Sequence, residues 1–146
     1  MVYVDTSALI KRYITDANSD AFDAFFMART PIAISRLTLV EMRCALSRRR
    51  RNGEISVILE EQAMDELRID IQDGVVVVHP VGDDQVAHTL HLIGQVAPLP
   101  LRTLDALHLS IAQRNHNQDF ATSDKNQAAA AQALGLTVFT FFPSKS

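Results

Sequence analysis

The chain opens with the stretch MVYVDTSALI (residues 1–10), which runs from strand-forming residues directly into an acid and two hydroxyls. Val2, Tyr3 and Val4 are β-branched or aromatic and predict a short buried strand. Asp5 follows this strand, and an apolar helical pattern begins just after it. A carboxylate at the end of a buried strand is costly unless other groups neutralise it. The interpretation of the whole chain therefore depends on which side chains come to meet Asp5.

The composition favours one folded domain over residues 1–146. The chain has 146 residues, of which 47% are hydrophobic, and this is enough to bury a core. Its 14 basic and 17 acidic residues give a net charge of −3. This balance excludes a uniformly basic protein that coats nucleic acid, but it leaves room for a local basic patch.

The cysteine content and the hydropathy bear on the cellular compartment of the protein. Cys44 is the only cysteine, so an internal disulfide is impossible and a reducing compartment is expected. No apolar run reaches about 18 residues, and Asp5 interrupts any signal-peptide core. We therefore expect a soluble, cytoplasmic protein that does not enter a membrane.

Beyond the opening stretch, the hydrophobic periodicity alternates between strand and helix. The segment VVVV (75–78) is apolar on both faces, which is typical of a parallel strand covered on both sides. This alternation predicts an α/β fold, namely a three-layer α/β/α sandwich with a mainly parallel sheet. Sites in such sheets form beyond the carboxyl ends of the strands, where Asp5 is expected. Helices are expected at residues 7–14, 20–29, 37–51, 54–71, 83–96, 103–115 and 124–134, and further strands at 31–34, 75–78, 119–122 and 137–141.

The second candidate acid is Glu41, in SRLTLVEMRCAL (35–46). At helical spacing, Glu41 shares an apolar stripe with Leu37 and Cys44, where an unpaired charge is costly. The competing interpretation is a capping box, in which Thr38 is the cap and Glu41 the acid three residues later.

Two further acids stand at helix starts. Asp105, in LRTLDALHLSIA (101–112), is the only acid of a helix that is apolar almost all round, and it faces inward. The competing interpretation is an acid in the first turn that the helix dipole favours by about 0.3–1 kcal/mol. Asp124, in FATSDKNQ (120–127), follows a strand and begins a helix. It is also a plausible N-cap, with Gln127 completing a capping box.

Each acid alone could be a cap, but together they share one geometry at the carboxyl edge of a parallel sheet. Clustered carboxylates repel one another unless cations neutralise them. All-oxygen ligands suit hard ions such as Mg²⁺ or Mn²⁺. Carboxylates that hold such ions can activate water against a phosphodiester.

The motifs DTSALI, LTLVEMRCAL, LRTLDALHLSIA and ATSD resemble, in this order and over nearly the whole chain, those of the PIN-domain ribonucleases. The nearest resemblance is to the VapC-type toxins of toxin–antitoxin pairs. It implies a Mg²⁺- or Mn²⁺-dependent endoribonuclease whose catalytic acids are Asp5, Glu41, Asp105 and Asp124. Of these, it implies that Asp5, Asp105 and Asp124 hold the metal.

The resemblance also implies supporting residues and partners. Ser7 and Thr122 match hydroxyl positions that accompany the first and last acids. Asn126 stands where some members carry a further acid, which leaves open whether one or two metal ions bind. The implied reaction is attack by metal-activated water on an RNA phosphorus, which leaves 5′-phosphate and 3′-hydroxyl ends. A small cognate antitoxin and a homodimer are the implied protein partners.

Cations near the acids are candidates for holding RNA. Arg48, Arg49, Arg50 and Arg51 end the helix that carries Glu41, and Arg102 stands just ahead of Asp105. An acidic pocket repels RNA, so nearby arginines would help to bind phosphates. The competing interpretation is a solvated helix end whose cations complement the helix dipole.

Three other functions compete with the ribonuclease. A non-catalytic PIN-like interaction domain, which binds metal but scaffolds a partner, has Asn126 as its sequence support. A phosphoacceptor domain would need paired acids after the first strand, but Thr6 and Ser7 follow Asp5. A dinucleotide-binding domain would need a G-x-G-x-x-G motif, which the sequence does not contain. For His108, on the face of Asp105, a core or supporting role is favoured over a general base.

Overall fold

The computed structural model describes residues 1–143 and contains a five-stranded sheet in the order β3-β2-β1-β4-β5. All four strand pairings are parallel, as the sequence predicts. The first strand in the sequence, β1, therefore lies at the centre of the sheet. The strands are β1 (Val2–Val4), β2 (Ile32–Ser35), β3 (Val76–His79), β4 (Asp119–Thr122) and β5 (Thr137–Thr140).

Each predicted helix has a counterpart, with ends that differ by no more than a few residues. The largest difference is at α4, which begins at Val57 instead of residue 54 because the Ser56 hydroxyl caps it by accepting a hydrogen bond from the amide of Leu59. At the end of α3, Gly53 adopts φ 75°, which a glycine tolerates without strain. The helices in residues 1–143 are α1 (Thr6–Tyr13), α2 (Ser19–Arg29), α3 (Arg36–Arg51), α4 (Val57–Gln72), α5 (Asp83–Val96), α6 (Thr103–Arg114) and α7 (Lys125–Ala133).

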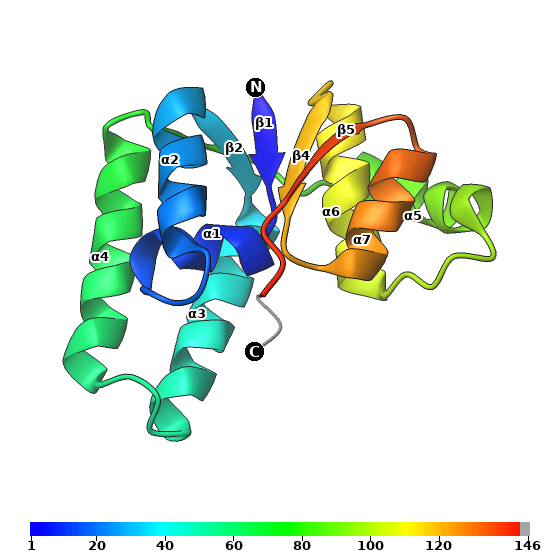
Figure 1. Cartoon of the computed structure of the whole chain (residues 1–146). Coiled ribbons are helices and arrows are strands. Elements are labelled where there is room, and N and C mark those ends of the chain that lie inside the picture. Colours follow the sequence, from blue (N-terminus) through cyan, green and yellow to red (C-terminus); the bar gives the residue numbers. More distant parts are fainter. Residues whose placement is uncertain (144–146) are drawn as a thin grey trace.

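The helices cover both faces of the sheet and form a three-layer sandwich (Figure 1). Helices α1 to α4 pack on one face and α5 to α7 on the other. Alternation along β1 sends Val2 and Val4 into the first core and Tyr3 into the second, where it packs with Phe120 and Leu109. The predicted α/β/α architecture is confirmed.

This architecture brings the carboxyl ends of the parallel strands to one edge of the sheet. The backbone amide of Asp5 donates to the carbonyl of Ala121 at 3.0 Å, which holds the end of β1 beside β4. Ser35 ends β2 on the other side of β1, and Thr122 ends β4. The residues that follow these strands therefore share one small region.

Two expectations concern the chain as a whole. None of the helices within residues 1–143 is long and apolar enough to cross a membrane. The single domain expected over residues 1–146 stays a prediction, since the last three residues lie outside those that the structure describes.

Candidate active site

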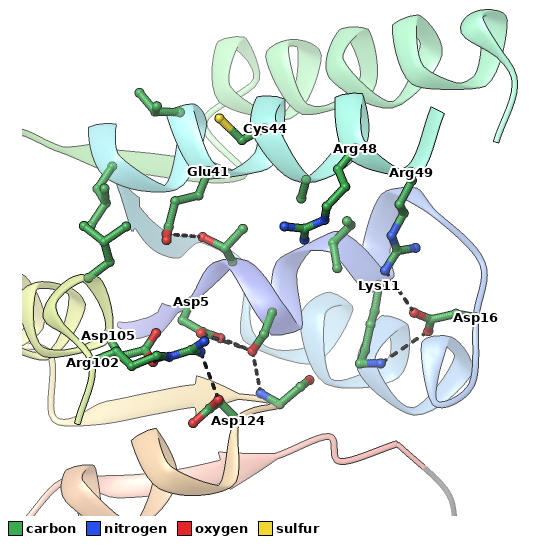
Figure 2. Close-up of a pocket in the computed structure, with 18 of the residues that line it drawn as sticks. Asp5, Lys11, Asp16, Glu41, Cys44, Arg48, Arg49, Arg102, Asp105 and Asp124 are labelled. Atoms are coloured by element: carbon green, nitrogen blue, oxygen red, sulfur yellow. Dashed lines mark hydrogen bonds and ion pairs between the residues drawn. The ribbon is translucent and has the colours of Figure 1, made fainter. Parts of the chain in front are cut away.

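A pocket of about 640 Å³ opens at the carboxyl edge of the sheet, between α1, α3 and the start of α6. Four of the acids that line it come from the end of β1, the middle of α3, the first turn of α6 and the loop after β4, and a fifth, Asp16, lies in the loop between α1 and α2 (Figure 2). The structure thus brings together the acids that the sequence singled out: Asp5, Glu41, Asp105 and Asp124.

Asp5 is the most deeply buried acid of the pocket, with 3% of its surface exposed. It caps α1, because its Oδ1 accepts hydrogen bonds from the Ser7 hydroxyl at 2.8 Å and from the Ala8 amide at 3.3 Å. Burial nevertheless disfavours the charged form and raises the pKa of Asp5 to about 6. The fold therefore holds this carboxylate firmly but at an electrostatic cost.

Arg102 bridges two of the other acids. Its Nε donates to Asp105 Oδ2 at 3.0 Å, and its Nη2 donates to Asp124 Oδ2 at 3.4 Å. Burial raises the pKa of Asp105, and the guanidinium opposes that rise. The side chain of Arg102 is 80% exposed, so this cation sits at the mouth of the pocket and not in its floor.

Asp124 caps α7 as well as lining the pocket. Its Oδ1 accepts a hydrogen bond from the Gln127 amide at 2.8 Å. The predicted return bond from the Gln127 side chain is wrong, because Gln127 instead accepts from the Thr122 hydroxyl at 2.7 Å and donates to the Asp105 carbonyl at 3.2 Å. The capping interpretation is therefore correct for Asp124, and it leaves Oδ2 facing Arg102.

For Glu41 the capping interpretation is wrong. Helix α3 is capped by Ser35, whose backbone amide donates to the hydroxyl of Thr38 at 3.1 Å. Glu41 lies a turn further on, where it accepts a hydrogen bond from the Thr6 hydroxyl at 2.7 Å and pairs with His108. Burial works against the charged form, but the bonds from His108 and Thr6 outweigh it and lower the pKa of Glu41.

The candidate supporting residues occupy different places. The Ser7 hydroxyl donates to Asp5 and accepts from the Ser123 amide at 2.9 Å, which ties the end of β1 to the loop after β4. Thr122 is fully buried and accepts from the Asp124 amide at 3.0 Å. Asn126 is exposed in the first turn of α7 and is not among the described residues that line the pocket.

The arginine run at the end of α3 divides into two pairs. Arg48 and Arg49 line the pocket on the α3 side (Figure 2). Arg50 points elsewhere, since its Nε donates to the buried Glu60 at 2.8 Å, and Arg51 donates to Ser47 at 2.9 Å. The pocket thus has an acidic end beneath Arg102 and a cationic end on α3.

Sequence reasoning missed four polar residues of the pocket, namely Thr6, Lys11, Asp16 and Ser123. Thr6 holds Glu41, and Lys11 lies at the cationic end with only 6% exposure, where it pairs with Asp16 at 3.3 Å. The two hydroxyls directly after Asp5 were the available signal for Thr6. No sequence pattern marks Lys11 as a pocket residue. Its position in the pocket depends on how the loop that contains Asp16 packs against α1, which is a tertiary contact.

The donor set fits a hard divalent cation, although it is not assembled around one. Within residues 1–143, no three His, Cys, Asp or Glu side chains form a ready-made metal site. At the pocket mouth, Arg102 lies between Asp105 and Asp124 and pairs with both. The pocket acids offer only oxygen ligands and already attract one positive charge, which is the chemistry that Mg²⁺ or Mn²⁺ requires.

The chain is similar to known proteins over most of its length. The model of the PIN domain family matches residues 2–133, which include all four acids. Ribonuclease VapC46 of Mycobacterium tuberculosis is 30% identical over 139 residues, which cover 94% of this chain and 95% of that protein. The chain therefore belongs to the PIN domain family, as the motifs indicate.

Solved structures show the same fold. VapC20 of M. tuberculosis, described as a sarcin-ricin loop cleaving toxin, superposes with a TM-score of 0.68 at 18% identity over 89% of this chain and 95% of that one. VapBC2 from Rickettsia felis, bound to a DNA fragment from its promoter, gives 0.66 at 17% identity over 97% and 99%.

The raised pKa of Asp5 predicts a pH-dependent stability. A carboxyl whose pKa rises from 3.8 to about 6 on folding contributes its full stability below pH 3.8 and loses it as the pH rises through about 6. Asp5→Asn keeps the helix cap but cannot ionise. In EDTA at pH 7 we expect this variant to be more stable than wild type, by up to about 3 kcal/mol at 1.36 kcal/mol per pKa unit.

Urea melts of both proteins between pH 4 and pH 7 measure this difference. Asp65→Asn, which removes an exposed carboxylate of α4 paired with Arg68, is the matched control and should track wild type. Equal stabilities of wild type and Asp5→Asn across this range would contradict a destabilising charge at Asp5.

Proposed function

We propose that this protein is a metal-dependent endoribonuclease and the toxin of a toxin–antitoxin pair. The observation that carries the proposal is the meeting of four acids from distant segments in one pocket of a PIN-domain chain. The relative named a ribonuclease and the neighbour described as a loop-cleaving toxin support RNA as the substrate. We propose Mg²⁺ or Mn²⁺ as the cofactor because the pocket acids supply oxygen ligands only.

Asp5, Asp105 and Asp124 are the residues that would hold the cation. When bound, a divalent cation neutralises their charge and favours deprotonation of a water molecule. Arg102 must first leave Asp105 and Asp124. Its side chain is 80% exposed, so water can replace part of the hydrogen bonding that the guanidinium gives up when it leaves the two acids, although Asp105 itself is only 15% exposed. Once released, Arg102 can donate to an RNA phosphate at the pocket mouth.

Glu41 is the residue best placed to orient the attacking water. Its lowered pKa keeps it ionised, so that it can accept a hydrogen bond from water. Ser7 and Thr122 hold Asp5 and the Asp124 backbone in place. In this scheme Asn126, exposed beyond the pocket lining, has no role in the reaction.

The cationic end of the pocket would hold a second phosphate of the strand. Glu41 and Arg48 are seven residues apart on α3, or about 10.5 Å along the helix axis at 1.5 Å per residue. This spacing suits Arg48 and Arg49 to a phosphate next to the one at the acidic end. Arg50 forms an ion pair with the buried Glu60, which gives it a structural role. Neither Arg50 nor Arg51 lines the pocket, so a role in RNA binding lacks comparable support for both.

The proposed protein partners are a small antitoxin and a second copy of this chain. Among the solved structures of similar fold are a toxin–antitoxin complex from Klebsiella pneumoniae and VapBC from Salmonella typhimurium. Exposed apolar side chains on α3 and α4, such as Val40 at 63% and Ile58 at 68%, could receive a partner helix. Since its RNA substrate would be intracellular, we place the protein in the cytoplasm.

The proposal predicts RNA cleavage that needs both the cation and the acids. With millimolar Mg²⁺ or Mn²⁺, purified wild type should cleave RNA, and excess EDTA should abolish cleavage. Asp5→Asn or Asp105→Asn should lower the rate by about 10²-fold or more, because each removes a charged ligand. Mapping the cut sites on total cellular RNA with wild type and Asp5→Asn measures the effect.

The Asp65→Asn variant again serves as the control and should cleave like wild type. Full activity in EDTA, or in both site variants, would rule out the mechanism. A wild type that binds Mn²⁺ but leaves RNA intact would favour the interaction domain instead.

A second prediction concerns Arg48 and Arg49. If they bind phosphates, Arg48→Ala with Arg49→Ala should weaken the binding of single-stranded RNA and flatten its salt dependence. The expected change in the slope of log K against log salt is about 0.7 per lost contact. Anisotropy titrations in EDTA at several salt concentrations measure this slope. Arg51→Ala, outside the pocket, is the control; equal slopes in all proteins would return the run to the solvated-surface interpretation.

A further inference from the structure

A chain of hydrogen bonds leads from the end of β2, through the centre of the sheet, to the pocket. The hydroxyl of Tyr3 donates to Ser35 Oγ at 2.9 Å and lies 2.7 Å from His108 Nδ1. The opposite ring nitrogen of His108, Nε2, is hydrogen-bonded to Glu41 Oε1. Three elements that are far apart in the sequence are thereby joined behind one carboxylate of the site.

The inner members of this relay are buried and fixed by packing. Tyr3 is 0% exposed and His108 is 1% exposed. The ring of Tyr3 stacks on Phe120 with centroids 5.5 Å apart, and its centroid lies 5.7 Å from that of His108. Neither side chain can turn away without opening the core, so the hydroxyl of Tyr3 sets the orientation of the imidazole.

At Glu41, the relay acts on one oxygen only. The Thr6 hydroxyl and His108 Nε2 both bind Oε1, and no hydrogen bond to Oε2 is found in residues 1–143. Glu41 also lines the pocket. One oxygen is therefore anchored in the protein and the other is available to the pocket.

We propose that His108 and Tyr3 are positioning residues that hold Glu41 by one oxygen and present its second oxygen to the attacking water. This inference rests on the proposed ribonuclease function. A purely structural histidine needs partners for its nitrogens but has no reason to use a pocket carboxylate. A general base would need water at Nε2, and here Glu41 occupies that nitrogen.

The two tyrosines of the chain allow a matched test. Tyr3→Phe removes only the hydroxyl that orients His108 and keeps the ring on Phe120. Tyr13→Phe also removes a hydroxyl from a largely buried tyrosine, one that donates to Asp70 Oδ2 at 2.7 Å away from the pocket. Tyr3→Phe loses the bonds to Ser35 and His108, and Tyr13→Phe loses the bond to Asp70, so only Tyr3→Phe breaks the relay.

With RNA and saturating Mg²⁺, we expect Tyr3→Phe to lower kcat by about 10-fold or more, as the loss of a supporting hydrogen bond does in other metal sites. KM should stay within about twofold of wild type, because the change does not touch the substrate-binding surface. Tyr13→Phe should match wild type in both constants. Equal kcat values for the two variants, or a rise in KM without a fall in kcat, would overturn the proposal.

Rescue at His108 separates positioning from packing. His108→Gln can keep an amide donor near the position of Nε2, whereas His108→Leu fills the space without a donor. We expect His108→Gln to retain more kcat than His108→Leu at similar melting temperatures. Equal loss in both variants would assign His108 to the core.

A readout without metal or RNA keeps the inference separate from the proposed function. In EDTA, the ring ¹⁵N shifts of His108 should move in Glu41→Gln and in Tyr3→Phe but not in Tyr13→Phe. If wild type cleaves no RNA, the proposed function fails and these shifts decide whether the relay exists. Unmoved shifts would overturn the relay even in an active enzyme.

Discussion

The charge of Asp5 is the constraint around which this site is built. The sheet order places β1 between β2 and β4, so the residue after β1 emerges at the most enclosed point of the carboxyl edge. A carboxylate there loses its hydration and must find donors within the protein. Ser7 and the Ala8 amide supply them from α1, but burial still raises the pKa of Asp5. The site therefore combines a firmly held carboxylate with an unsatisfied demand for positive charge.

That demand explains the distribution of cations around the pocket. Arg102, at the mouth, bridges Asp105 and Asp124 from a largely exposed position. Arg48 and Arg49 lie across the pocket on α3, where Arg49 is 4.0 Å from the carboxylate of Asp16 (Figure 2). In the proposed function, both arrangements are needed, because the acids would hold a metal ion and the arginines would offset their repulsion of RNA. A net charge of −3 is compatible with this function because the few relevant cations are concentrated in one place.

The sequence predicts the fold well because its periodicity is local and unambiguous. The buried strand VYV and the run VVVV each identify a parallel strand, and α3 ends at Arg51, where the helix expected from residue 37 was to end. Helix starts are less predictable because they depend on which hydroxyl becomes the cap; Ser56 and Ser35 were both overlooked. The pocket acids could be chosen from the sequence, but their partners could not. Whether Glu41 bonds to Thr38 or to Thr6 and His108 depends on tertiary contacts between α3, α1 and α6.

Capping and chemistry are not alternatives at these positions. Asp124 accepts the amide of Gln127 with Oδ1 and meets Arg102 with Oδ2. Glu41 is anchored through Oε1, and Oε2 is left to the pocket. A carboxylate has two oxygens, and the fold uses one of them to fix the position of the other. An acid that caps a helix at the carboxyl edge of a parallel sheet is thus already oriented for binding a cation. This is why a capping motif at such an edge does not weigh against a functional role.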